Sequence, residues 1–377
     1  MKVDVLISGM GLAGTVLAET LIQRGKSVAI FDPCSHVSPS LPNNLEAQRE
    51  EKLNSSRIAA GIFNPINQKR FAPHWKFDEF YAKAMPFYQN IEIESGPPLL
   101  HLLPSYHIFK DAGQQNDWLT KGCEPHLMKY ISPNPKIGLE LVRQPFEGVS
   151  FNASGFVNTQ ALIEQTIDRL TGTPTSNNMV TGWRPRQPAN HFINEKLDFA
   201  KLEINTTINY QNIEAESLVL CNGFADWQNP YFPSLPFYPS KGEILTLEIP
   251  DFSTDCILHN GVYLVPIENG VFKCGATYNH INLNDAPSEE GKAWLTKHLN
   301  NLLKIPYKII NHLAAVRPTV KDRRPLLGKS LTHNNVFMLN GLGTKGVLMA
   351  PLLADLLCSH IFDGLPLPKE MDIARFY

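Results

Sequence analysis

The sequence predicts an α/β protein of two domains. Its 377 residues exceed one ordinary domain of about 100 to 200 residues, and 43% of them are hydrophobic, which is enough to bury a large core. A glycine turn between an apolar run and a helical pattern opens the chain, as in a parallel sheet with crossover helices. Residues 244–280 alternate apolar and polar side chains between turn signals at Asp251 and Gly270, which predicts antiparallel strands.

The composition excludes several classes of protein. There are 34 basic and 36 acidic residues and no basic stripe, so nucleic acid is disfavoured as a partner. No apolar run reaches the ~18 residues of a membrane helix. The nearest, Val347–Phe362, is interrupted by Pro351 and Asp355. The six cysteines form no CxxC pair and no metal-ligand spacing, which predicts a cytoplasmic protein with reduced thiols and no metal site.

The amino terminus predicts a dinucleotide site. Val3–Ile7 is expected to form a strand, Gly9-Met10-Gly11-Leu12-Ala13-Gly14 a turn, and Thr15–Gln23 a helix. Val28–Phe31 is the next predicted strand, and it ends at Asp32, 18 residues after Gly14. This is close to the separation at which an acidic residue binds the ribose of a dinucleotide.

Each part of this motif has a physical role. Gly9 makes the tight turn, Gly11 lets the backbone approach a pyrophosphate, and Gly14 lets the helix pack on the strand. Backbone N–H groups at the start of the helix face the anion. Because Asp32 would accept a hydrogen bond from a ribose 2′-hydroxyl and repel a 2′-phosphate, FAD or NAD is favoured over NADP.

A second glycine turn lies near the carboxyl terminus. Asn335–Leu339 is predicted to be a strand, Gly341-Leu342-Gly343-Thr344-Lys345-Gly346 a turn, and Val347–Phe362 an amphipathic helix. The amino end of that helix, with Lys345 beside it, would stabilise negative charge on the pyrimidine end of a reduced flavin. The turn therefore favours FAD, and an ordinary strand-to-helix connection is the alternative.

Seven motifs follow one another along the chain. They are the opening glycine turn with Asp32, Ser55-Ser56-Arg57-Ile58-Ala59-Ala60-Gly61, Ser217–Gly223, Tyr238-Pro239-Ser240-Lys241-Gly242-Glu243, Tyr263-Leu264-Val265-Pro266 with Gly275-Ala276-Thr277, Arg317-Pro318-Thr319 with Asp322 and Pro325, and the second glycine turn. In this order the sequence resembles the D-amino-acid oxidase family over nearly its whole length, in particular the glycine oxidase and monomeric sarcosine oxidase branch.

The resemblance implies a Rossmann-like FAD-binding domain interleaved with an antiparallel-sheet substrate domain. The FAD-binding domain would take residues 1–80, 146–235 and 311–377, and the substrate domain 81–145 and 236–310. Besides the two glycine turns and Asp32, the resemblance assigns a further set of cofactor contacts: Ser55, Ser56, Ala60, Gly61, Val180, Asn222 and Gly223. Noncovalent FAD is expected, because no cysteine lies in the stretch through which monomeric sarcosine oxidases attach their flavin.

The implied reaction oxidises the C–N bond of a small amino acid or N-substituted glycine, by hydride transfer to flavin N5 and hydrolysis of the imine. Arg317 matches the carboxylate-binding arginine, whose planar fork suits a carboxylate. Tyr263 matches the tyrosine whose hydroxyl joins it. Lys273 falls where the sarcosine oxidase branch keeps a lysine that promotes reaction with oxygen. Each residue also has a structural alternative: Arg317 could form an ion pair, Tyr263 could pack on an inner strand face, and Lys273 could face solvent from a strand.

Other interpretations stay open at this point. Thr277 stands where sarcosine oxidases have an active-site histidine, which counts against methylated glycine as substrate. The second glycine turn also resembles that of a tRNA uridine-modifying oxidase that cleaves a carboxymethylamino group, so a larger substrate is an alternative. Others are a flavin dehydrogenase with an acceptor other than oxygen, a nicotinamide dehydrogenase, and a flavin-binding subunit without turnover. Residues Ser35–Asn54 lengthen the connection after Asp32, as a lid or a surface excursion.

Overall fold

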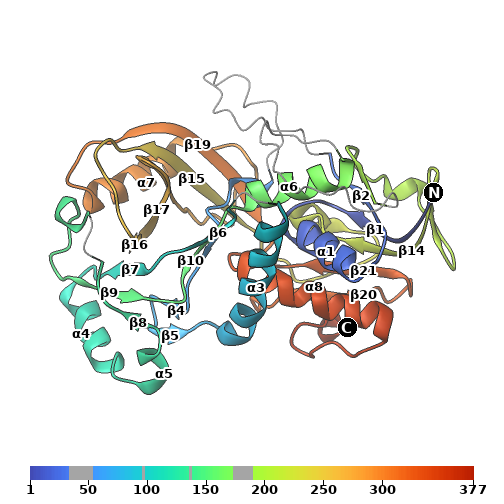
Figure 1. The fold of residues 1–377 in the computed structure, drawn as a ribbon, viewed down its shortest axis with the longest axis horizontal. Coiled ribbons are helices and arrows are strands. Elements are labelled where there is room, and N and C mark those ends of the chain that lie inside the picture. Colours follow the sequence, from blue (N-terminus) through green and yellow to red (C-terminus); the bar gives the residue numbers. More distant parts are fainter. Residues whose placement is uncertain (34–53, 96–97, 136–137, 173–189) are drawn as a thin grey trace.

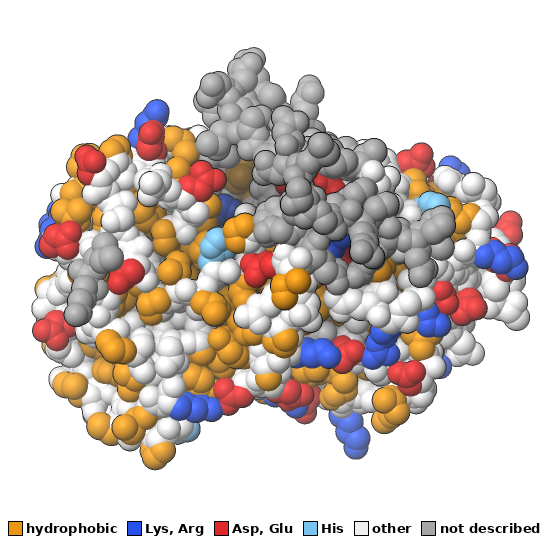
Figure 2. Space-filling view, in the orientation of Figure 1, with side chains coloured by type: hydrophobic (Ala, Val, Ile, Leu, Met, Phe, Trp, Pro, Cys, Tyr) orange, Lys and Arg blue, Asp and Glu red, His pale blue; other side chains and the backbone are white. Residues whose placement is uncertain are grey.

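The computed structural model describes residues 1–33, 54–95, 98–135, 138–172 and 190–377. Its two large sheets lie side by side along the long axis of the molecule (Figure 1). On the face shown in Figure 2, basic and acidic side chains are interspersed rather than gathered by sign. The predicted lid, apart from its last residue, and the predicted cofactor contact at Val180 lie outside the described residues.

The first sheet is mostly parallel. Its strands are β1 (Lys2–Ser8), β2 (Val28–Phe31), β11 (His191–Ile193), β12 (Glu203–Ile204), β13 (Ile208–Tyr210), β14 (Ile213–Leu220), β20 (Leu326–Lys329) and β21 (Val336–Asn340). They lie in the order β11-β2-β1-β14-β13-β12, with β21 pairing β14 and β20 pairing β21. Strands β2, β1, β14 and β21 run parallel to one another. The predicted α/β class is confirmed.

Helices contact both large sheets. The chain forms α1 (Leu12–Gln23), α2 (Ser55–Ile58), α3 (Phe77–Ser95), α4 (Ala112–Lys121), α5 (Pro125–Met128), α6 (Thr159–Thr171), α7 (Glu289–Leu302) and α8 (Gly346–Asp363), with 3₁₀ turns η2 (Leu139–Leu141), η3 (Phe199–Lys201), η4 (Gly223–Gln228) and η5 (Ile373–Phe376). By length and composition α8 could cross a membrane, but it packs against both α1 and α3, and half of its residues are buried. It is therefore a core helix.

The second sheet is mostly antiparallel. Its strands are β7 (Ser105–Ile108), β8 (Ile131–Ser132), β9 (Gly148–Phe151), β15 (Ser240–Glu248), β16 (Ile257–Asn260), β17 (Val262–Glu268), β18 (Val271–Gly275) and β19 (Lys308–Arg317), in the order β19-β15-β18-β17-β16-β7-β9-β8. One face carries apolar side chains that pack under α7, such as Leu245, Leu264 and Cys274. Two smaller sheets complete the fold. One has the strand order β3 (Ile62–Phe63), β10 (Gly155–Val157) and β6 (Leu100–Leu102), and the other pairs β4 (Ile66–Asn67) with β5 (Ala72–Pro73).

Most predicted elements lie where the patterns put them. The antiparallel pairing of β15, β17 and β18 confirms the interpretation of residues 244–280. The first helix begins at Leu12, three residues earlier than expected, because the Thr15 N–H already bonds to the Gly11 carbonyl. The two sheets are interleaved along the chain, and β9 and β19 extend the second sheet into segments predicted for the FAD-binding domain. The domain boundaries themselves stay a prediction.

Candidate active site

Four neighbouring parallel strands end at one edge of the first sheet. Gly9 follows β1, Asp32 follows β2, Asn222 lies just after β14, and Gly341 follows β21. Because the carboxyl ends of parallel strands meet at the same edge, the fold brings together both glycine turns, Asp32 and the Asn222-Gly223 pair. Ligands of open α/β sheets bind at such an edge.

Steric contacts explain the glycines of the first turn. A Cβ at Gly14 would lie 1.9 Å from the carbonyl oxygen of Gly9, and Gly9 itself has a φ of +97°. Gly11 caps α1 without a side-chain hydrogen bond, so no side chain of its own covers the start of the helix. Ser56 Oγ accepts a hydrogen bond from Leu12 N at 2.9 Å, so this predicted cofactor contact lies at the amino end of α1.

Asp32 is buried and only partly satisfied. Its Oδ2 accepts a hydrogen bond from Met10 N at 2.6 Å, which fixes the carboxylate beside the glycine turn. Its Oδ1 is buried with no hydrogen-bond partner among the described residues. Leaving such an oxygen unpaired costs about 1–3 kcal/mol, and a ribose hydroxyl would satisfy it. The edge of the first sheet therefore fits the nucleotide part of FAD.

The second glycine turn meets the first. A Cβ at Gly346 would lie 2.8 Å from a methyl carbon of Leu12, so the starts of α1 and α8 are in contact. Lys345 is half-buried at the amino end of α8, and its Nζ lies 2.8 Å from His74 Nε2 and 3.5 Å from Asn64 Oδ1. Burial lowers the pKa of Lys345 to about 8. The turn thus brings a cation to the edge where the parallel strands end, and its role toward a flavin stays a prediction.

A second half-buried lysine, Lys273, contacts the beginning of the segment 58–64, whose last residue is Asn64. Lys273 Nζ donates to the carbonyl oxygens of Ala59 at 3.0 Å and Ile58 at 3.4 Å, and burial lowers its pKa to about 8. Lys273 is therefore not a solvent-facing strand lysine. Lys273 and Lys345 hold opposite ends of the 58–64 segment, which contains the predicted flavin-contacting residues Ala60 and Gly61.

Arg317 and Tyr263 occupy neighbouring positions on one face of the second sheet. A Cβ at Gly242 would lie 2.0 Å from Arg317 Nη2, and one at Gly275 would lie 2.6 Å from Tyr263 Oη. Gly275 pairs with Ile244, two residues from Gly242, so both glycines point to the same face. Missing side chains at these two glycines leave the room that the guanidinium and the phenol fill. Lys273, two residues before Gly275, shares this face.

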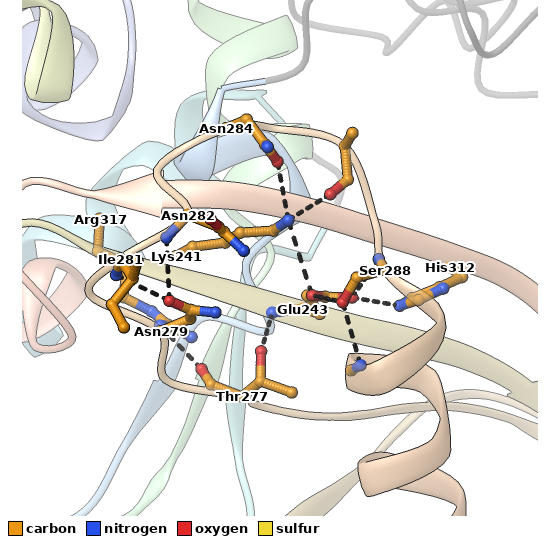
Figure 3. Close-up of polar contacts among 12 residues, drawn as sticks. Lys241, Glu243, Thr277, Asn279, Ile281, Asn282, Asn284, Ser288, His312 and Arg317 are labelled. Atoms are coloured by element: carbon orange, nitrogen blue, oxygen red, sulfur yellow. Dashed lines mark hydrogen bonds and ion pairs between the residues drawn. The ribbon is translucent and has the colours of Figure 1, made fainter.

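The planar guanidinium of Arg317 is covered on its faces. Gly242 lies on one side, and the Tyr278 ring centre lies 4.8 Å from Arg317 Cζ. Nη1 donates to the Thr277 carbonyl at 3.3 Å (Figure 3). Burial raises the pKa of Tyr263 well above its usual value, and the charge of Arg317 acts in the opposite direction. The guanidinium of Arg317 and the hydroxyl of Tyr263 thus give this face two groups that donate hydrogen bonds.

A buried polar network fixes the loop that carries Thr277 and Tyr278. Lys241 Nζ donates to Asn284 Oδ1 at 2.8 Å, and Glu243 accepts from Ser288 N at 2.9 Å and Ser288 Oγ at 2.7 Å (Figure 3). Thr277 Oγ1 accepts from Glu243 N at 2.9 Å. Thr277, which departs from the sarcosine oxidase pattern, therefore supports the loop over Arg317.

Sequence analysis missed several residues of this region. His259 pairs with Tyr263 across β16 and β17, so it shares the face of Tyr263, and its Nε2 is buried without a partner among the described residues. Burial lowers the pKa of His259 to about 3. The alternation of β16 and β17 could have found it. Asp226, which accepts from Asn222 and Asn340 and so ties the loop after β14 to the end of β21, has no sequence signal.

These features are those of a dinucleotide-binding protein with a second, mostly antiparallel sheet beside the dinucleotide-binding one. The chain belongs to the FAD dependent oxidoreductase family, which its residues 4–360 match. FAD is therefore its cofactor and the chain is an oxidoreductase, as predicted. The individual roles of the site residues stay predictions, and so does noncovalent attachment of the FAD.

Similar proteins match different shares of the chain. This chain is 23% identical over 399 residues to the tRNA 5-methylaminomethyl-2-thiouridine biosynthesis bifunctional protein MnmC of Marinobacter nauticus, and the match covers 99% of this chain and 58% of that protein. The chain thus spans little more than half the length of this relative. Bacillus subtilis glycine oxidase is 27% identical over 157 residues, 39% of this chain and 42% of that one. The structure of Geobacillus kaustophilus glycine oxidase shares the fold, with a TM-score of 0.73 at 18% identity over 100% of this chain and 98% of that one.

Proposed function

We propose that this chain oxidises the C–N bond of a small amino acid or N-substituted glycine. The observation that carries the proposal is the shared position of Arg317 and Tyr263 on one face of the second sheet, where two glycines make room for them. Together they offer N–H and O–H donors to a single carboxylate. Relatives named glycine oxidase support an amino acid as substrate.

The chain's own residues bind and orient. FAD, when bound, supplies the two-electron acceptor. The first glycine turn, Asp32 and Ser56 would hold its nucleotide part, and the second glycine turn, with Lys345 at the amino end of α8, would stabilise negative charge at its pyrimidine end. Holding the substrate carboxylate at two points removes much of its rotational freedom. Apolar packing of Ala60 against the second sheet excludes water beside this face.

The charge of the site favours a neutral substrate amine. Arg317 and Lys273 bring positive charge to the face of the second sheet, and Lys345 brings it to the cofactor edge. The pKa of His259 on that face is lowered to about 3 by burial, by His107 and by Lys345, so its imidazole is neutral near pH 7. Positive surroundings lower the pKa of a bound ammonium group, because like charges repel. The amine can then release its proton to solvent before oxidation.

Paired substrates test the proposal. The FAD-loaded chain is mixed without oxygen with small amino acids and N-substituted glycines, each next to its carboxamide, and flavin absorbance is followed. At least one carboxylate should bleach the flavin, and its carboxamide should do so about a hundredfold more slowly, because it cannot form a charged pair with Arg317. Bleaching by no compound, or equal rates for acid and amide, contradicts the proposal.

One observation favours a second candidate, the oxidation of a carboxymethylamino group carried by a larger molecule. Tyr278, which covers Arg317, is 66% exposed, and Tyr238, whose backbone bonds to Thr319, is 49% exposed. Aromatic rings beside the carboxylate anchor could stack on a base of a larger substrate. A nucleoside bearing a carboxymethylaminomethyl group, compared with free N-substituted glycines, separates the two: faster bleaching by the nucleoside favours the larger substrate.

A further inference from the structure

Lys345 is a cation with no acid partner among the described residues. Its ammonium group contacts His74 Nε2 at 2.8 Å and Asn64 Oδ1 at 3.5 Å, and burial alone accounts for the lowering of its pKa. Neutral acceptors are therefore what keeps this ammonium charged before a ligand arrives. A hydrogen bond from a charged donor is stronger than one between neutral groups, so each acceptor matters.

His74 is fixed by its own backbone. Its N–H donates to the Pro65 carbonyl at 2.8 Å, and its carbonyl accepts from Phe77 N at 3.1 Å, so the turn after β5 sets its position. Next to it, the Arg324 guanidinium lies 4.0 Å from the Trp75 ring centre. Burial and the charge of Lys345 lower the pKa of His74 to about 3, so its imidazole is neutral near pH 7.

The proton positions follow from chemistry. His74 Nε2 lies 2.8 Å from Lys345 Nζ and 3.1 Å from Asn64 Oδ1. A charged ammonium has no lone pair, so while Lys345 is charged Nε2 accepts from it and carries no proton, and the imidazole proton is on Nδ1. Asn64 Oδ1 then receives a second N–H of the same ammonium. The charge of Lys345 also helps to lower the pKa of His259 of β16, which pairs with His107 of β7. Neither histidine brings a negative charge to Lys345.

We propose that His74 is a positioning residue: it accepts a hydrogen bond from the Lys345 ammonium and holds that charge at the amino end of α8, where it stabilises the anionic form of the bound flavin. The inference rests on the proposed placement of the pyrimidine ring beside Lys345. It extends that placement to a residue 271 positions away in the chain. His74 touches neither substrate nor cofactor in this account.

Sulfite binding to the FAD-loaded protein tests the proposal. Sulfite adds to oxidised flavin and leaves negative charge on the pyrimidine ring, so its dissociation constant reports the nearby cation. His74→Phe should raise that constant about tenfold or more, and Lys345→Met should raise it further, because one removes a hydrogen bond to the charge and the other the charge itself. His74→Gln, whose amide oxygen can accept the bond, should stay within about threefold of the unaltered protein.

The pH profile distinguishes positioning from mere structural support. Sulfite affinity of the unaltered protein should fall as pH rises through the Lys345 pKa of about 8, since the cation is lost above it. In His74→Phe the fall should lie at lower pH, because the ammonium has lost an acceptor that favours its charged form. Ratios of variant to unaltered protein at each pH cancel the titration of sulfite itself.

Controls separate the possible failures. Lys83→Met removes a lysine that pairs with Asp355 on the outer side of α8 and should leave sulfite affinity unchanged. His74→Ala tests the same bond without added bulk if His74→Phe loses its flavin. Weaker sulfite binding in Lys345→Met but not in either His74 variant overturns the inference and leaves the cofactor site standing. Unchanged binding in Lys345→Met overturns the placement of the pyrimidine ring as well.

Discussion

The edge of the first sheet and the face of the second sheet are built in different ways. At the edge, backbone atoms make the site: glycines allow the chain to come within van der Waals contact of itself, and helix starts supply N–H groups. On the face, side chains make the site, and Arg317 and Tyr263 are brought together by the register of four strands. At Gly9 and Gly14 the edge should therefore tolerate no added carbon, whereas the face should tolerate change by moving a flexible side chain.

Gly14→Ala should have the largest effect. The new Cβ would lie 1.9 Å from the Gly9 carbonyl oxygen, which is backbone and cannot move aside without opening the turn. We expect the purified protein to lose most of its FAD, measured as flavin absorbance per protein. Gly113→Ala in α4 is the matched control, because its Cβ would meet only a side-chain oxygen of Asp111 at 3.2 Å. Full flavin content in Gly14→Ala would show that the edge is not as rigid as described.

Gly242→Ala should act on the face and spare the edge. Its Cβ would fall 2.0 Å from Arg317 Nη2, the far end of a flexible side chain, so the guanidinium should shift rather than the strand. We expect the substrate dissociation constant in anaerobic flavin reduction to rise about tenfold, with flavin content unchanged and the limiting rate less affected. An unchanged dissociation constant would place the substrate carboxylate elsewhere.

Lys273→Met should separate reduction of the flavin by substrate from its reoxidation by oxygen. A cation at this position would stabilise negative charge as oxygen is reduced, whereas substrate oxidation does not need it. We expect reoxidation of the flavin by oxygen to slow about tenfold, and reduction by substrate to change far less, both by stopped-flow absorbance. Equal effects on both half-reactions would remove this role. Reoxidation by a quinone but not by oxygen in the unaltered protein would favour a dehydrogenase.

The smallest expected effect is a pH dependence. The pKa of Lys273 is lowered to about 8, so its charge is present below that pH and is lost as the pH rises through it. The rate of reoxidation by oxygen should accordingly fall as the pH rises through about 8. In Lys273→Met this fall should be absent. A fall that persists in the variant would assign the titration to another group, with Lys345 as the next candidate.

The two regions also differ in how far the sequence predicts them. The predicted bounds of β2 are the observed ones, and α8 begins within one residue of its predicted start. Strand, turn and helix are each encoded by consecutive residues, so the sequence predicts them well. Arg317 and Tyr263 were assigned through the family resemblance alone, since their meeting depends on pairing between distant strands. The contact of His74 with Lys345 joins residues 271 apart and carries no local pattern, so only the structure shows it.

The central claim is that Arg317 anchors the substrate carboxylate on the face of the second sheet. Its most direct test is the rate of anaerobic flavin reduction in Arg317→Ala and Arg317→Lys, at equal flavin content, with the best substrate of the panel. We predict a loss of about a hundredfold or more in the rate at low substrate for Arg317→Ala, and only partial recovery in Arg317→Lys, which lacks the planar fork. Reduction of Arg317→Ala at the unaltered rate would contradict the account.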